Sequence, residues 1–162
     1  MSAQTMILFL LAFIIHNAEE SIWLVRAAGR PAKIRLHAAP TQDQFLLAVL
    51  FITSLAILVA ALALFFPGQP IFTYAFFGYV GAMVLNVIGV HLLQTLIDRR
   101  YSPGLMTGLL ALLPVGSLLI EKGLRVHLIT VAGLLAATVV MAALLLAAIV
   151  LMFRVADKWI VY

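Results

Sequence analysis

The sequence predicts an all-α, polytopic membrane protein: a helix bundle of about five transmembrane helices that forms one integral membrane domain over residues 1–162. Hydrophobic residues make up 65% of the chain, charged residues only 10%, and the mean hydropathy is +1.20. Soluble domains are roughly 45–50% apolar and about 25% charged. A chain of this length cannot bury so much apolar surface in a water-facing fold, so we expect lipid to surround it.

Two further features of the composition exclude classes of function. The chain has no cysteine, which rules out a disulfide framework, a thiolate metal site and a thiol nucleophile. The formal net charge is +4, but the lysines and arginines lie in short clusters beside apolar runs. This pattern is typical of topology signals and lipid-headgroup contacts, so we expect membrane lipid, and no nucleic acid, as a partner.

The first span is predicted over about residues 4–25. Its apolar run, Met6 to Ile15, is too short to cross a bilayer and must continue through His16–Glu20 to Val25 to reach roughly 20 residues. No lysine or arginine precedes the run and no small-residue cleavage site follows it. We therefore expect a retained span and no signal peptide.

Four further spans are predicted, and turn signals separate them. A basic loop over 26–43 follows the first span, and a Pro-Gly-Gln-Pro turn over 67–70 separates the second span from the third. Ser102 is the expected N-cap of the fourth span, with Pro103 as its first helical residue. Pro114 and Gly116 predict a kink in that span, and residues 121–127 form the last loop. The expected ranges of these spans are 45–66, 71–97, 105–120 and 128–153.

The charge distribution predicts the orientation of the bundle. With five spans, one side of the membrane holds four lysines and arginines in 26–43, two in 98–103 and two in the C-terminal tail. The other side holds only Lys122 and Arg125. The positive-inside rule then places the N-terminus outside and the C-terminus in the cytoplasm, and we expect the inner membrane of a bacterial cell.

Ionisable residues inside the spans mark the candidate site. Glu19 and Glu20 lie about six residues before the cytoplasmic end of the first span, and His91 lies about six residues before that end of the third. At 1.5 Å per residue, all three share a depth of roughly 9 Å. His16 shares a helix face with both glutamates through spacings of three and four. A charged side chain in a span costs at least ~2.5–3.5 kcal/mol, which favours a functional reason for this placement.

These residues resemble the HXXEE membrane protein family. The family's pattern is an HXXEE motif, one further histidine and a YXPG motif, and here these are His16-Asn17-Ala18-Glu19-Glu20, His91 and Tyr101-Ser102-Pro103-Gly104. The three elements occur in the family's order and cover most of the chain up to residue 104. The resemblance implies a multi-spanning membrane protein suspected of being an enzyme, without an established reaction.

Structural readings compete with functional ones at each of these positions. The glutamates would be solvated at the interface, hydrogen-bonded between helices or paired with Arg26, and His91 would be an interhelical hydrogen-bond partner. Tyr101 would be an interfacial anchor that precedes the start of a helix. In the functional reading, Tyr101 closes the mouth of the pocket and orients its hydroxyl toward a substrate.

The leading hypothesis is a small membrane-embedded enzyme that acts on a lipidic or isoprenoid-like substrate. In one mechanism, His16, His91 and one of Glu19 and Glu20 hold a divalent metal ion while the other glutamate acts as acid or base. In the other, no metal is present, a protonated glutamate donates to the substrate and His91 accepts. The alternatives are a small transporter or proton- or cation-coupled carrier, and a non-catalytic membrane partner protein. A chain of five helices is also a candidate for homo-oligomerisation.

Overall fold

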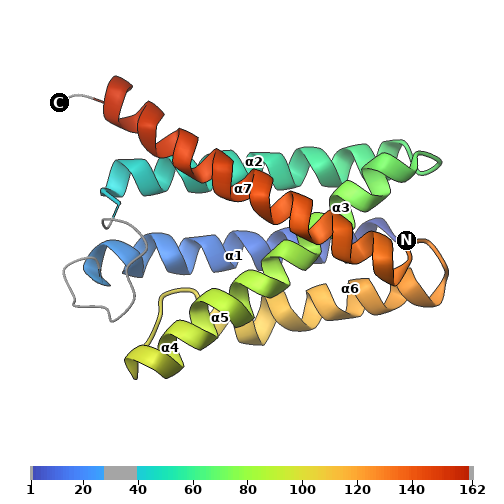
Figure 1. Cartoon of the computed structure of the whole chain (residues 1–162), viewed down its shortest axis with the longest axis horizontal. Coiled ribbons are helices and arrows are strands. Elements are labelled where there is room, and N and C mark those ends of the chain that lie inside the picture. Colours follow the sequence, from blue (N-terminus) through green and yellow to red (C-terminus); the bar gives the residue numbers. More distant parts are fainter. Residues whose placement is uncertain (1, 28–39, 161–162) are drawn as a thin grey trace.

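The computed structural model describes residues 2–27 and 40–160, and within these ranges the chain is all-helical (Figure 1). In this described part of the chain, five stretches of helix are long and apolar enough to cross a membrane, so the predicted fold class is confirmed. The third and fourth stretches each contain a π-helical segment, η1 and η2. The elements in chain order are α1 (Ala3–Ala27), α2 (Gln42–Phe65), α3 (Pro70–Leu85), η1 (Asn86–Leu92), α4 (Leu93–Asp98), α5 (Leu105–Thr107), η2 (Gly108–Leu112), α6 (Leu113–Arg125) and α7 (Val131–Trp159).

The starts of α2 and α7 follow from local capping chemistry. Thr41 forms a capping box with Gln44: its hydroxyl accepts a hydrogen bond from the Gln44 backbone, and its own backbone N–H donates to the Gln44 side chain. Thr130 caps α7 by accepting from the Gly133 N–H at 3.1 Å. Most of the basic loop predicted over 26–43 falls on residues 28–39, outside the described residues.

Two local expectations are wrong. The fourth span begins at Leu105 after Gly104, so Ser102 is no N-cap and Pro103 is not helical. The helix of that span continues through the expected loop to Arg125, where Glu121 and Arg125 pair one turn apart. The wider turns of η2 end two residues before Pro114, where a kink is predicted; a proline has no N–H to donate to the preceding turn.

Large apolar side chains cover much of the outer surface of the bundle, as expected for contact with lipid. Leu50, Leu110 and Leu135 are more than half exposed. The only solvent in which this surface is favourable is the hydrocarbon of a bilayer. The structure therefore supports insertion of all five long helical stretches.

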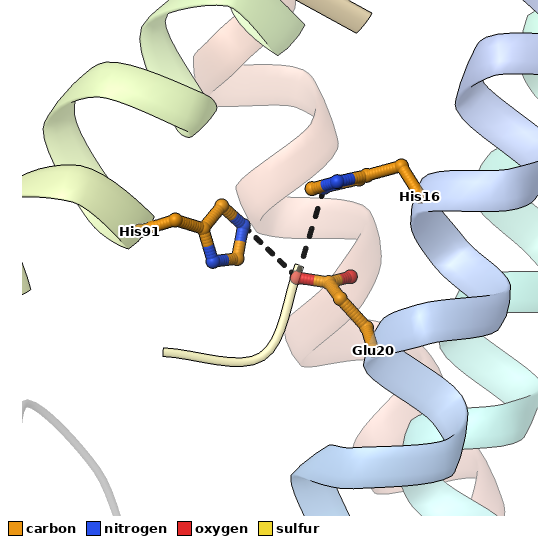
Figure 2. Close-up of side chains that lie close together, drawn as sticks. All are labelled: His16, Glu20 and His91. Atoms are coloured by element: carbon orange, nitrogen blue, oxygen red, sulfur yellow. Dashed lines mark ion pairs between the residues drawn. The ribbon is translucent and has the colours of Figure 1, made fainter. Parts of the chain in front are cut away.

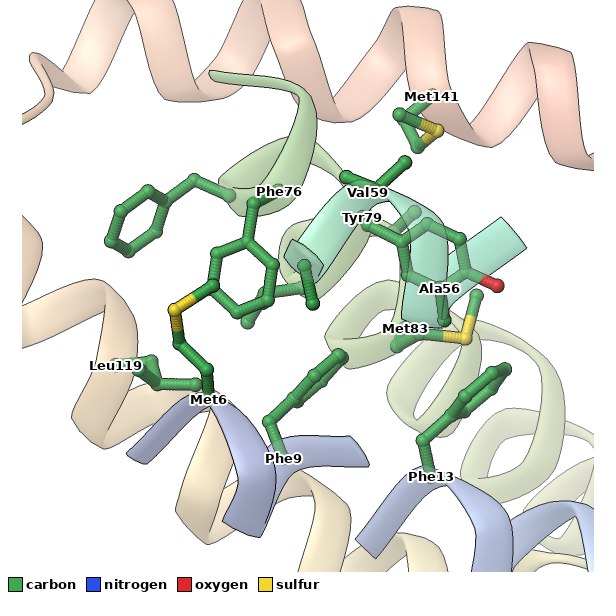
Figure 3. Close-up of a cluster of buried hydrophobic side chains, with 14 of the residues drawn as sticks. Met6, Phe9, Phe13, Ala56, Val59, Phe76, Tyr79, Met83, Leu119 and Met141 are labelled. Atoms are coloured by element: carbon green, nitrogen blue, oxygen red, sulfur yellow. The ribbon is translucent and has the colours of Figure 1, made fainter. Parts of the chain in front are cut away.

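An aromatic core lies one turn before the candidate site on α1 (Figure 3). The rings of Phe9 and Phe13 are stacked, and Phe13 meets Tyr79 of α3 edge-on with centroids 5.6 Å apart. The buried Tyr79 hydroxyl donates to the Ile52 carbonyl of α2 at 2.7 Å. These contacts join α1, α2 and α3 next to His16 and fix the position of α1 from which His16 projects.

Small residues allow α3 to approach α7 closely. A Cβ at Gly78 would lie 2.6 Å from the Ala137 carbonyl oxygen, and one at Gly81 would lie 2.1 Å from the Thr138 hydroxyl. Close backbone approach through small residues is the usual means of packing helices in lipid. This contact holds the span that carries His91.

Candidate functional site

Three ionisable side chains from two helices meet inside the bundle (Figure 2). His16 and Glu20 project from α1, and His91 projects from η1. Glu20 Oε1 lies 3.0 Å from His91 Nε2 and 3.9 Å from His16 Nε2. One donor atom from each of the three residues lies within 4.8 Å of the others. We call these three residues the HEH group.

The HEH group is enclosed by protein. His16 is 1% exposed and His91 4% exposed, and their rings meet edge-on with centroids 5.0 Å apart. Glu20 is partly buried. The meeting of the first and third spans expected from sequence is therefore observed at Glu20 and His91. The competing expectation of a pair between the glutamates and Arg26 concerns a side chain outside those that the structure describes.

A hydrogen-bond chain assigns the tautomer of His16. The Thr107 hydroxyl donates to Glu19 Oε2 at 2.6 Å, so its oxygen is free to accept from His16 Nδ1, which lies 3.5 Å away. The proton is then on Nδ1, and Nε2 presents its lone pair to the HEH group. That nitrogen is buried and has no hydrogen-bond partner among the residues that the structure describes.

Both ring nitrogens of His91 have polar neighbours. The Ser102 hydroxyl donates to Gln94 Oε1 at 3.5 Å and can therefore accept from His91 Nδ1, which lies 3.3 Å away. The Asn86 amide nitrogen lies 3.0 Å from His91 Nε2, and Glu20 Oε1 lies 3.0 Å from the same atom. In both histidines the nitrogen that faces Glu20 is Nε2.

Three atoms that can ligate a metal ion thus converge on one point. Glu20 Oε1 and His91 Nε2 lie 3.0 Å apart, the distance of a hydrogen bond in which the imidazole nitrogen donates its proton to the carboxylate. A metal cation bound to both atoms would take the place of that proton. The HEH group therefore has the donor atoms and the spacing to hold a metal ion.

Glu19 of α1 is not part of the HEH group and instead binds the turn over residues 101–104. Its carboxylate accepts from the Gly104 N–H at 3.0 Å, from the Thr107 N–H at 2.9 Å and hydroxyl at 2.6 Å, and from the Tyr101 hydroxyl. These donors occupy both carboxylate oxygens. The two adjacent glutamates, both predicted as metal ligands, therefore have different partners in the structure.

The hydroxyl of Tyr101 is held by protein groups on both sides. It donates to Glu19 and accepts from the Met106 N–H at 3.2 Å, while half of the residue's surface is exposed. Desolvation and the hydrogen bond to Glu19 raise the pKa of Tyr101 above its ordinary value, so the hydroxyl stays protonated at neutral pH. The role of Tyr101 toward a substrate remains a prediction.

Gly104 covers the HEH group directly. It has the left-handed backbone with φ of +89°, and a Cβ there would lie 2.9 Å from His16 Cε1, 2.9 Å from Glu20 Cγ and 3.0 Å from His91 Cε1. Only glycine brings the backbone this close in this conformation without strain. The turn that the YXPG motif forms is therefore a wall of the site.

Sequence reasoning missed Thr107, Ser102 and Asn86 as partners of the histidines. Thr107 and Ser102 orient the rings from behind, and Asn86 lies one π-helical turn before His91. A π-helix adds one residue to a turn and is frequent at functional sites, but its position has no clear signal in a single sequence. Ser102 stands inside the YXPG motif, which is the one signal that could have identified it.

Replacing Thr107 with valine is expected to loosen the site while leaving its three donors in place. The change removes the hydroxyl that links Glu19 to His16 Nδ1 and nearly preserves the side-chain shape. Loss of a partner behind a metal-bound histidine typically lowers metal affinity by about 10–100-fold. Titration of the purified protein with Co²⁺ would measure this loss. Thr5→Val is the control, because Thr5 lies near the start of α1 and its hydroxyl bonds to Ser2. Unchanged affinity in Thr107→Val would contradict the assigned hydrogen-bond chain.

Comparisons with known proteins agree with the motif pattern. A family described as a protein of unknown function with HXXEE motif matches residues 7–119. The uncharacterized protein YrkK of Bacillus subtilis (strain 168) is 40% identical over 150 residues, which cover 93% of this chain and 94% of that protein. No solved structure matches.

Proposed function

Because the chain belongs to the HXXEE family, whose function is unknown, we propose its function from the HEH group: a membrane-embedded, metal-dependent enzyme that acts on a lipidic or isoprenoid-like substrate. The observation that carries this proposal is the convergence of His16 Nε2, His91 Nε2 and Glu20 Oε1, with the first of these buried and unpartnered.

The spacing of the donors supports a metal site. A cation bound tetrahedrally with bonds of about 2.0–2.1 Å separates its ligand atoms by about 3.3 Å. The two distances from Glu20 Oε1 to the histidine nitrogens, 3.0 and 3.9 Å, lie on either side of this value. Binding an ion would require the side chains to move until all three donors lie at bonding distance.

The donor set supports a catalytic site more than a closed structural one. Two imidazoles and one carboxylate suit a divalent transition metal such as Zn²⁺ or Fe²⁺, and three protein ligands leave a position open for a substrate. When bound, such an ion would polarise a substrate oxygen. Thr107 and Ser102 would keep the two imidazoles in the required tautomer, and Glu19 would hold the turn that covers them.

The lipidic substrate class is supported by the location of the group. The HEH group lies between helices that span the membrane and directly beside an aromatic and aliphatic core. A ligand that reaches the group from the bilayer meets apolar surface along its path. Ionisable residues at such a depth are usually functional.

Metal analysis of the protein purified in detergent tests the proposal. We expect one divalent transition metal ion per chain after incubation with Zn²⁺ or Fe²⁺, and its removal by a chelator. Absence of a bound ion at saturating concentrations of both would overturn the metal-dependent enzyme. Uptake of an ion into vesicles that depends on Glu20 would instead favour the carrier.

The orientation is part of the same proposal: N-terminus outside, C-terminus in the cytoplasm of a bacterial cell. The clusters of lysine and arginine support it, since most of them fall on one side of the five long helical stretches. An alkaline phosphatase fused after Tyr162 is expected to be inactive, and a green fluorescent protein at the same place is expected to fluoresce. The opposite pair of results would contradict this orientation.

A further inference from the structure

A cavity of about 150 Å³ lies beside the HEH group, between α1, α2, α3 and α7. Its walls are mainly apolar and include Phe13 of α1, Ala48 of α2 and Met83 of α3. Phe45 and Phe153 line it where α2 begins and α7 approaches its end, and both are partly exposed. A dry cavity of about this volume holds a molecule the size of benzene, with about six non-hydrogen atoms.

One end of the cavity is polar. Asn17, Glu20 and Asn86 line it, and Glu20 is thus shared between the cavity and the HEH group. Asn17 is 3% exposed; its amide nitrogen donates to the Thr53 hydroxyl at 2.8 Å, and its oxygen is buried without a partner in residues 2–27 and 40–160. Leaving such a group unsatisfied is unfavourable, so a ligand that hydrogen-bonds to it gains affinity.

The chemistry of this polar end selects a hydroxyl group. The Asn17 oxygen and the Glu20 carboxylate both accept hydrogen bonds, so a hydrocarbon would leave them unpaired. A hydroxyl also accepts, and therefore serves the Asn17 amide in either of its two orientations. An ammonium group only donates, and a divalent cation in the HEH group would repel it.

We infer that the cavity binds the hydroxyl-bearing end of an apolar alcohol, such as a fatty or isoprenoid alcohol, with the hydroxyl at Asn17 and Glu20 and the first carbons between Phe13, Ala48 and Met83. The remainder of a longer chain leaves the cavity beside Phe45 and Phe153. This assignment deepens the proposed function and rests on it where it places the hydroxyl next to a metal ion. The cavity and its polar end do not depend on the metal.

Photolabelling in detergent tests the inference. The probe is a short aliphatic alcohol that carries a diazirine, and the competitors are 1-pentanol, n-hexane and 1-pentylamine at equal concentrations in the micelle. We expect labelled peptides from α2 and α7, and competition by 1-pentanol about tenfold stronger than by n-hexane, the size of one hydrogen bond to a buried acceptor.

Variants on the cavity wall make the test specific. Ala48→Leu fills the cavity and is expected to abolish labelling of α2 and α7, whereas Leu50→Ile, at an exposed position of the same helix, leaves it unchanged. Asn17→Leu should reduce the preference for 1-pentanol over n-hexane to less than about twofold. Labelling that persists in Ala48→Leu, or n-hexane or 1-pentylamine competing as well as 1-pentanol, would overturn the inference.

Metal analysis of the same samples separates the two proposals. A bound ion without preference for the alcohol overturns the alcohol site alone. A preference for the alcohol that is lost in Asn17→Leu, in protein that binds no ion, supports the alcohol site and overturns only the metal-dependent function.

Discussion

Replacing Glu20 with glutamine is expected to abolish metal binding, with an affinity loss larger than the roughly 10–100-fold that follows from removing a partner behind a ligand. The amide that replaces the carboxylate has no negative charge. It turns either a carbonyl oxygen, which is a weak metal ligand, or an NH₂ group toward the two histidine nitrogens. His91→Ala removes a second donor and is expected to have a similar effect. Co²⁺ absorption spectra and the metal content of purified protein measure both losses.

The matched control for this experiment is Glu121→Gln. Glu121 has the same side chain as Glu20 but lies exposed on α6, paired with Arg125 one turn away. Exposed ion pairs contribute little to stability, so this variant should bind metal as the wild type does. If Glu20→Gln stays folded, binds the same number of metal ions per chain and retains the wild-type affinity for them, the HEH group is not a metal site.

Replacing Gly104 with alanine is expected to disrupt the HEH group without changing any of its donors. The new Cβ would lie within 3.0 Å of atoms of His16, Glu20 and His91, and the backbone φ of +89° is unfavourable for any residue with a Cβ. The conformational strain alone is of the order of 1–3 kcal/mol. We expect a lower unfolding temperature in detergent and weakened Co²⁺ binding.

Gly89→Ala is the control for the Gly104 variant. Gly89 lies in η1, two residues before His91, and a Cβ there would meet no atom within 4 Å. Gly89 does not have a positive backbone φ, so alanine should leave the free energy of unfolding within about 1 kcal/mol of the wild type. Equal thermal stability and equal Co²⁺ affinity of the two variants would show that the turn over 101–104 is not a wall of the site.

These contacts give the two adjacent glutamates different roles. Glu20 faces the histidines, while Glu19 binds the backbone and hydroxyl groups of the turn that covers them. The HXXEE motif and the YXPG motif therefore meet in one structural unit, although about 80 residues separate them in the chain. Both the spacing of four between His16 and Glu20 and the adjacency of the glutamates have a physical reason in this arrangement.

The amino-acid sequence by itself determined the fold class and indicated the residues of the candidate site. The five apolar stretches dictate five long helices because a bilayer leaves the backbone no other way to satisfy its hydrogen bonds. The charges that interrupt otherwise apolar spans singled out His16, Glu20 and His91, since burying them in lipid is too costly without a reason. The resemblance in three motifs pointed to the same residues.

Only the tertiary structure decided which of these side chains face one another. A helix turns by about 100° per residue, so adjacent glutamates point in different directions, and the direction of each relative to another span depends on packing that no local pattern encodes. The π-helical turn that carries His91, the left-handed Gly104 and the polar partners Thr107, Ser102 and Asn86 are consequences of that packing. The cavity that Asn17 lines likewise exists only where four helices meet.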